Sequence, residues 1–358
     1  MDLSYKNLGS SDLNVSNICL GSMTFGEQTD KKESFKIIDY AFERGINFFD
    51  TAEMYPIYPK ESTQGDSERI LGEWIKNKKN RDKLIIGSKI ASSHPDGQGA
   101  TALKWIRGGG KNLKFNKYNL TEAINQSLKR LNTDYIDLYQ LHWPERLVPL
   151  FGELEFKYDQ NDIHWTPILE ILENLNEFIK EGKIRSFGIS NETAWGFSKY
   201  IHLAEKNNLQ TPASIQNAYS LLNRVFEISN SEISLRENVG LLAYSPLAGG
   251  RLSGKYLYNK KPKKARYTMW PGRFSRHLTV RGDQAVKKYY ELAKEFELDP
   301  VGLSYSFVLS KPFVSSCIIG VTSLSQLKQN LQCLEIKLTK EIIERIDKIH
   351  SSDPNPCV

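Results

Sequence analysis

Short apolar runs alternate with segments of helical spacing along nearly the whole chain. Each run has three to seven residues, and most are continuously apolar rather than alternating. Continuous hydrophobicity is typical of strands buried on both faces of a parallel sheet. The eight runs span residues 18–20, 46–49, 84–88, 135–141, 186–189, 214–216, 241–244 and 317–319.

Helical segments separate these runs, with apolar residues recurring at a helical period. They cover residues 34–44, 67–76, 120–131, 168–180, 195–207, 227–237 and 283–297. Eight strands alternating with helices predict an α/β fold of the (β/α)8 TIM barrel type rather than an open doubly wound sheet. No G-x-G-x-x-G motif follows the first run, which also argues against the open sheet. The 358 residues could form two domains, but we interpret residues 1–358 as a single barrel domain.

Three connections are too long to be plain turns: residues 90–119, 143–166 and 248–282, after the third, fourth and seventh strands. All three leave the face on which barrel enzymes carry their sites. Long ordered loops in a compact domain usually have a function. Residues 339–350 predict an extra C-terminal helix, and the tail 351–358 is expected to be ordered only if it packs over the barrel mouth.

Composition excludes several classes of protein. The net charge of +6, from 48 basic and 42 acidic residues, is mild and dispersed, so no nucleic-acid partner is expected. The basic residues between Lys104 and Lys117 are interpreted as a solvated surface, with a role in holding an acidic substrate as the alternative. No apolar run is long enough for a membrane span and the N-terminus lacks a signal core. We therefore expect a cytoplasmic protein without a membrane partner.

The cysteines show no metal-ligand or C-x-x-C spacing, so no metal is expected. Cys19, Cys317 and Cys333 lie in apolar surroundings and are interpreted as core thiols. Cys357 is expected to be a loose tail residue.

Four polar residues follow or close neighbouring strands. Asp50 ends the second run, Tyr55 lies on the loop after it, Lys89 closes the third and His142 closes the fourth. Each alone has a structural explanation: a strand-end cap, a packed loop aromatic, a solvated strand terminus and a core histidine. Together, at one end of adjacent strands, they indicate a shared active site.

These four groups can polarise and protonate a carbonyl oxygen. A phenol holds its proton at neutral pH, with an ordinary pKa of about 10, until a nearby ammonium stabilises the phenolate. An aspartate keeps that buried lysine charged, and a histidine can hydrogen-bond the carbonyl oxygen. Reduction also needs a hydride donor that no side chain supplies, so a nicotinamide cofactor is implied.

Eight further motifs occur in a fixed order. They are LGSMTFG (20–26), DTAEMY (50–55), GSK (87–89), DYIDLYQLHWP (134–144), GISN (188–191), IQNAYS (215–220), YSPLAGG (244–250) and SGKY (253–256). In this order they resemble the aldo-keto reductase superfamily over almost the whole chain, and within it the bacterial Tas protein branch, which is related to the potassium-channel β subunits. The resemblance implies that Tyr55 is the general acid, that Lys89 and Asp50 tune it, and that His142 positions the carbonyl.

The resemblance also implies an NADPH/NADP+ site. Ser190, Asn191 and Gln216 would bind the nicotinamide carboxamide, and Tyr244 would stack on the ring. Residues around them would hold the pyrophosphate and enclose the adenosine end. These cofactor residues are Ser22, Met23, Asp50, Ser245, Pro246, Leu247, Gly249, Gly320, Thr322, Gln326, Gln329 and Asn330.

The chain departs from the aldose-reductase branch around the 2′-phosphate. The Lys-Ser and Arg of that branch are replaced by Gly320, Val321 and Gln326. A preference for NADPH would therefore rest on Lys255 and Arg266, as in the channel-subunit branch.

The expected activity is reduction of a small aldehyde or ketone. The alternative is a cofactor-bound regulatory or scaffold subunit with slow turnover. The substrate-pocket walls are expected to be Phe25, Tyr58, Trp143 and Trp165, and neither the carbonyl substrate nor an oligomeric partner follows from the pattern.

Overall fold

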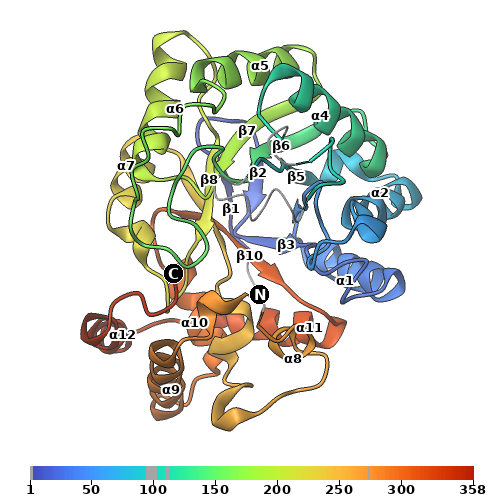
Figure 1. Ribbon diagram of the computed structural model, residues 1–358. Coiled ribbons are helices and arrows are strands. Elements are labelled where there is room, and N and C mark those ends of the chain that lie inside the picture. Colours follow the sequence, from blue (N-terminus) through green and yellow to red (C-terminus); the bar gives the residue numbers. More distant parts are fainter. Residues whose placement is uncertain (1–2, 94–102, 110–112, 273) are drawn as a thin grey trace.

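Eight parallel strands close into a barrel in the computed structural model, which describes residues 3–93, 103–109, 113–272 and 274–358 (Figure 1). The order around the barrel is β10-β3-β4-β5-β6-β7-β8-β9. Every predicted run overlaps one of these strands, which confirms the (β/α)8 prediction. The strands are β3 (Ile18–Gly21), β4 (Phe48–Asp50), β5 (Ile85–Ile90), β6 (Ile136–Leu141), β7 (Ile184–Ser190), β8 (Ser214–Ala218), β9 (Gly240–Tyr244) and β10 (Val314–Gly320).

Helices surround the barrel, and side-chain caps begin many of them: Asp30, Asn116, Thr193 and Thr339 each accept a backbone N–H of the first turn. The helices are α1 (Lys31–Glu43), α2 (Asp66–Lys78), α4 (Lys117–Leu131), α5 (Ile168–Lys180), α6 (Ala194–Lys206), α7 (Asn230–Arg236), α8 (Arg266–Met269), α9 (Val280–Glu295), α10 (Pro300–Leu309), α11 (Leu324–Gln332) and α12 (Lys340–Ser352). Short 3-10 helices are η1 (Glu61–Thr63), η2 (Arg81–Lys83), η4 (Val225–Glu227), η5 (Ala248–Ser253), η6 (Leu257–Asn259), η7 (Ser275–His277) and η8 (Cys333–Glu335).

The sequence pattern did not predict α10 or α11. In α10 all residues from Val301 to Val308 are buried, so the helix lacks the polar face that produces a 3.6-residue period. In Figure 1 the orange and red segments α8 to α12 gather on one side of the barrel. They carry or support the loops that follow β9 and β10.

A short hairpin that was not predicted precedes the barrel. Its strands, β1 (Tyr5–Asn7) and β2 (Asn14–Ser16), pair antiparallel and are too short to show an alternating pattern. Leu8 and Leu13 are fully buried and belong to one apolar cluster with Leu138 and Leu242. The hairpin thus closes the amino-terminal end of the barrel and leaves the opposite end for the site.

The C-terminal tail corrects one expectation. Cys357 is not loose: it is 1% exposed, and its N–H donates to the Leu222 carbonyl at 3.2 Å. The Thr279 hydroxyl donates to the Pro356 carbonyl at 3.0 Å. The tail therefore packs against the loops after β8 and β9. Cys333 also differs from expectation because it is only half-buried.

None of the described helices has both the length and the apolar character needed to cross a membrane.

Candidate active site

A cavity of about 1580 Å³ lies at the carboxyl ends of the barrel strands. Ligand pockets for drug-sized molecules usually measure about 300–1,000 Å³. The cavity therefore has room for a dinucleotide together with a small substrate. Its walls come from strand ends and from the long loops after β5, β6 and β9.

A buried ion pair lies at the base of this cavity. The Lys89 ammonium donates to Asp50 Oδ2 at 2.6 Å and to the Thr51 carbonyl at 2.7 Å, and the Lys89 side chain is fully buried. Burial lowers the pKa of Lys89, but the Asp50 carboxylate and the Tyr55 phenol oppose it, and the net pKa is raised. Lys89 therefore stays charged inside the barrel.

The Tyr55 phenol is the next group above this pair. Lys89 Nζ lies 3.5 Å from the Tyr55 hydroxyl oxygen and 4.8 Å from the ring centroid. Burial raises the pKa of Tyr55, the Lys89 charge lowers it and the Asp50 charge raises it again, with a net increase. The phenol is thus protonated at neutral pH and has a cation beside it that would stabilise the phenolate after proton transfer.

His142 adjoins the phenol from the end of β6. Its ring centroid lies 5.6 Å from that of Tyr55 and 4.7 Å from that of Trp143. Burial, with the Lys89 charge, holds the pKa of His142 well below its usual range, so the imidazole is neutral. Its Nδ1 is buried and has no hydrogen-bond partner among the described residues, and the residue lines the cavity.

Amide and hydroxyl groups from β7, β8 and β9 form the adjacent wall. The Tyr244 hydroxyl donates to Asn191 Oδ1 at 2.6 Å, and Asn191 Nδ2 donates to the His142 carbonyl at 2.8 Å. The Ser190 hydroxyl donates to the Gln216 carbonyl at 2.7 Å. These bonds fix the Tyr244 ring and the amides relative to His142.

The loop after β9 supplies a concave backbone. Ser245, Ala248, Gly249 and Gly250 all have positive φ, at 57°, 47°, 66° and 92°. Backbone N–H groups in such turns can converge on an anion. At Gly249 a Cβ would lie 2.2 Å from the Tyr267 hydroxyl, so a side chain there would displace the loop.

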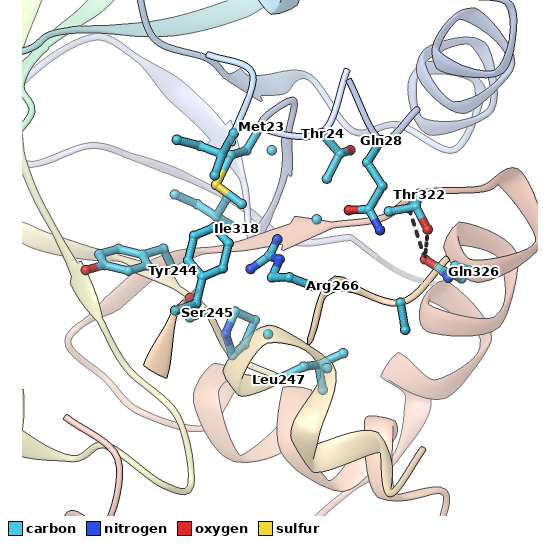
Figure 2. Close-up of a pocket in the computed structure, with 18 of the residues that line it drawn as sticks. Met23, Thr24, Gln28, Tyr244, Ser245, Leu247, Arg266, Ile318, Thr322 and Gln326 are labelled. Atoms are coloured by element: carbon cyan, nitrogen blue, oxygen red, sulfur yellow. Dashed lines mark hydrogen bonds between the residues drawn. The ribbon is translucent and has the colours of Figure 1, made fainter. Parts of the chain in front are cut away.

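Two cations of the same loop have no anionic partner among the described residues. Arg266 reaches into the cavity between Met23 and Leu247 (Figure 2). Burial lowers the pKa of Arg266, and burial with the neighbouring Arg266 charge lowers the pKa of Lys255. Both side chains are half-buried, and charges withdrawn from water are normally paired, so this pair of cations is suited to an anionic ligand.

The opposite wall comes from the loop after β10 and from α11. There Gln326 Oε1 accepts hydrogen bonds from the Thr322 backbone N–H at 2.9 Å and from the Thr322 hydroxyl at 3.1 Å (Figure 2).

Most of the predicted site residues meet at this cavity. Asp50, Tyr55 and His142 line it, with Lys89 directly behind. All the predicted cofactor residues except Ser22 line it, as do Tyr58 and Trp143.

Apart from Lys89, three predicted residues do not line the cavity. The Ser22 hydroxyl is buried and donates to the Asp50 carbonyl at 3.0 Å. Phe25 is 1% exposed within the main core. Trp165 lies at a separate small hollow, where its indole N–H donates to the Asp162 carbonyl at 3.0 Å.

The expectation of a solvated surface between Lys104 and Lys117 is wrong for Arg107. Its guanidinium is 5% exposed and pairs with the buried Glu53 carboxylate. Of the other basic residues there, Lys104 and Lys117 are exposed and Lys114 is half-buried; Lys111 lies outside the described residues.

Pattern reasoning missed several apolar cavity walls, because they lie on irregular loops without periodicity: Met54, Ile57, Leu103, Leu150 and Phe151. It also missed Gln140, although a polar residue within the apolar run 135–141 was an available signal.

Comparison with known proteins agrees with this geometry. The family model described as "Aldo/keto reductase family" matches residues 17–351. The chain is 41% identical to Protein tas of Escherichia coli over 348 residues, covering 97% of this chain and 98% of that protein. It is 37% identical over 284 residues to an aldo-keto reductase of Babesia bovis, covering 75% and 96%. It is 28% identical to a probable voltage-gated potassium channel subunit beta of Oryza sativa subsp. japonica, covering 98% of each.

The chain therefore belongs to the aldo/keto reductase family, and its role is that of an oxidoreductase. This family typically uses NAD(P)H. The residues present fit such a dinucleotide. Arg266 and Lys255 offer charges that no described carboxylate pairs, Tyr244 offers a ring face, and Gln216 offers an amide at the base of the cavity.

Proposed function

We propose that the protein reduces an aldehyde or ketone to an alcohol with NADPH. The observation that carries the proposal is the position of Lys89, whose ammonium contacts both the Asp50 carboxylate and the Tyr55 hydroxyl beside the neutral imidazole of His142.

Each of these groups has a part in the reaction. A bound reduced nicotinamide would supply the hydride. Tyr55 donates its proton to the carbonyl oxygen, and Lys89 stabilises the phenolate until solvent returns a proton. His142 donates a hydrogen bond to the same oxygen and so orients the carbonyl. Asp50 holds the ammonium charged and in place.

The cofactor residues of the proposal are those that surround the cavity. Ser190, Asn191 and Gln216 would hold the carboxamide and Tyr244 would stack on the ring. Met23 and Asp50 lie nearby. The loop after β9 (Ser245, Pro246, Leu247 and Gly249) would hold the pyrophosphate. The connection from the end of β10 into α11 (Gly320, Thr322, Gln326, Gln329 and Asn330) would enclose the adenosine. Ser22 would not contact the cofactor itself; its hydroxyl would support the site by donating to the Asp50 carbonyl.

NADPH is preferred in this proposal because Arg266 and Lys255 have no carboxylate partner among the described residues and would meet the 2′-phosphate. The substrate end is apolar and aromatic, with Tyr58, Trp143 and Leu150 among its walls. The cysteines are all free thiols, which fits the reducing cytoplasm.

The second candidate is a cofactor-bound regulatory subunit with slow turnover. The likeness to the potassium channel subunit beta named above favours it. Purified protein assayed with aldehydes, ketones and sugars, with NADPH against NADH, separates the two. Repeated turnover of at least one carbonyl class supports the reductase, whereas oxidation limited to one equivalent of NADPH supports the regulatory subunit.

A further inference from the structure

Gln140 is a polar side chain in the middle of a buried strand. It lies in β6 and is 0% exposed. The reaction outlined above gives it no part. A buried amide must satisfy its hydrogen bonds inside the protein, so its partners indicate what it does.

Its partners are the carboxylate of the catalytic pair and a second amide. Gln140 Nε2 donates to Asp50 Oδ1 at 3.2 Å. Gln216 Nε2 donates to the same Asp50 oxygen at 2.9 Å and to Gln140 Oε1 at 2.9 Å. The three side chains form a closed hydrogen-bonded triangle beneath the cavity.

The chemistry of the carboxylate sets the direction of both amides. An ionised carboxylate only accepts hydrogen bonds, so Gln140 and Gln216 must each turn their NH2 group towards Asp50. Gln140 then has its carbonyl oxygen left to accept the second hydrogen of Gln216. Both hydrogens of Gln216 are thereby used, and Gln216 Oε1 has no partner among the described residues.

A glycine on β5 makes room for this arrangement beside Gln140. Gln140 pairs in register with Lys89 on β5 and Gly188 on β7. A Cβ at Gly87 would lie 3.3 Å from Gln140 Nε2, closer than ordinary van der Waals contact, whereas one at Gly188 would make an ordinary contact of 3.4 Å with Gln140 Cγ. Glycine at position 87 therefore lets Gln140 extend towards Asp50.

We propose that Gln140 is a positioning residue that directs Gln216 Oε1 into the cavity as a hydrogen-bond acceptor. Such an acceptor selects a ligand group that carries an N–H, such as the carboxamide of nicotinamide, over a group that only accepts. The inference rests on the proposed function, because it takes the ligand at Gln216 to be the nicotinamide end of the cofactor. Without Gln140, one hydrogen of Gln216 is free, and its amide can tilt to donate to an acceptor.

Cofactor binding in the absence of substrate tests this directly. The probes are NADP+ and its 3-acetylpyridine analogue, in which an acetyl group replaces the carboxamide and removes the NH2. Their dissociation constants are measured by quenching of tryptophan fluorescence, since Trp143 lines the cavity. Wild-type protein should bind NADP+ more tightly. Gln140→Met keeps the side-chain volume but removes both hydrogen bonds. It should narrow the ratio of the two dissociation constants, analogue over NADP+, by about three- to tenfold, the range for one hydrogen bond.

Two further variants give the controls. Gln216→Met should narrow the ratio at least as far as Gln140→Met does, and adding Gln140→Met to it should change the ratio no further, because Gln140 acts through Gln216. Gln210 also donates from a partly buried amide, to Ser186 Oγ at 2.9 Å, and lies outside the cavity. Gln210→Met should leave the ratio at the wild-type value.

Gln140→Asn keeps the test decisive if the Met variant does not fold. The variant keeps an amide in the buried strand but shortens it by one methylene, which withdraws it from Asp50 and Gln216. The ratio should therefore narrow as it does in Gln140→Met protein.

The outcomes separate this inference from the proposed function. No binding of NADP+ by wild-type protein would overturn both. Binding of NADP+ without preference over the acetyl analogue, or an unchanged ratio in folded Gln140→Met protein, would overturn the role of Gln140 and leave the reductase intact.

Discussion

Glu53 and Arg107 form a buried ion pair that joins two loops of the site. The Arg107 guanidinium contacts both Glu53 carboxylate oxygens, and Arg107 Nη2 donates to the Ala91 carbonyl at 2.7 Å. Glu53 lies on the loop that carries Tyr55. Tyr55 in turn belongs to one apolar cluster with residues of the loop after β5, among them Ile106. The ion pair therefore helps to hold Tyr55, the proposed general acid, in place.

Breaking this pair from one side should be costly. We expect Arg107→Met to lower the free energy of unfolding by about 3–5 kcal/mol, because it leaves the buried Glu53 carboxylate without a cation, with the Ala91 N–H still donating to it at 2.6 Å. Denaturant unfolding followed by circular dichroism measures this free energy of unfolding. The double variant Glu53→Gln with Arg107→Met removes both charges and should recover much of the loss. Additive losses would show that the charges are not coupled.

Tyr55→Phe removes the proposed proton donor and keeps the ring volume. We expect kcat to fall by at least about a hundredfold, the lower range for loss of a general acid, with little change in NADPH affinity. Steady-state kinetics and a fluorescence titration measure the two quantities. Near-normal turnover would exclude Tyr55 as the acid.

Lys89→Met should lower kcat as much as Tyr55→Phe does, because the phenolate loses its stabilising charge and the Asp50 carboxylate loses its cation. The pKa values of Lys89 and Tyr55 are both raised. Because the pKa of Lys89 is higher in the folded protein, charged Lys89 contributes fully to folding stability below its pKa in the unfolded chain, about 10.4. That contribution is lost as the pH rises through the pKa of the folded protein. Wild-type turnover should therefore hold through neutral pH and decline only in strong alkali. An unchanged pH profile in Lys89→Met protein would contradict the assignment.

The double change Lys255→Ala and Arg266→Ala tests whether these two cations determine the preference for NADPH over NADH. Each charge-assisted contact with the 2′-phosphate contributes about 1.5–3 kcal/mol, so the variant should bind NADPH at least about a hundredfold more weakly. NADH lacks that phosphate and its affinity should change little. Fluorescence titration of the parent protein and the double variant with both nucleotides measures these affinities. An equal loss for both would mean that these cations contact the pyrophosphate.

His277 should make stability depend on pH. It is 5% exposed and its Nδ1 lies 2.8 Å from the Tyr267 hydroxyl. Burial and nearby arginine charges hold its pKa well below the usual value. Below about pH 6.5 the unfolded chain therefore binds a proton that the folded protein does not, which lowers stability by up to about 1.4 kcal/mol per pH unit.

His277→Gln should reduce the loss of stability between pH 7.5 and 5.5. Unfolding free energies of both proteins at the two pH values give the comparison. Equal losses would show that His277 does not contribute.

How far the sequence could predict the structure depends on how local the signal was. The apolar runs predicted all eight barrel strands, because a strand buried on both faces must be apolar along its own length. The run of residues 300–309 gave no helical period, since α10 is buried all round. The hairpin of β1 and β2 was too short for any pattern.

The residues of the candidate site also divide into those that local sequence could predict and those that packing placed. The order of strands alone was enough to expect Asp50, Tyr55, Lys89 and His142 together, because successive parallel strands end at the same face. Phe25 was expected at the pocket, but the direction of a loop side chain depends on its packing, and this one points into the core.

The sequence by itself therefore determined the barrel, the face that carries the candidate site and the identity of the groups that end its strands, since each follows from the period and spacing of residues close in the chain. Only the tertiary structure decided that Arg107 pairs with Glu53 and that Gln140 connects Asp50 to Gln216. Those partners are 54, 90 and 76 residues apart. They meet because burial makes an unpaired charge or amide costly, a requirement that exists only once the chain has closed around them.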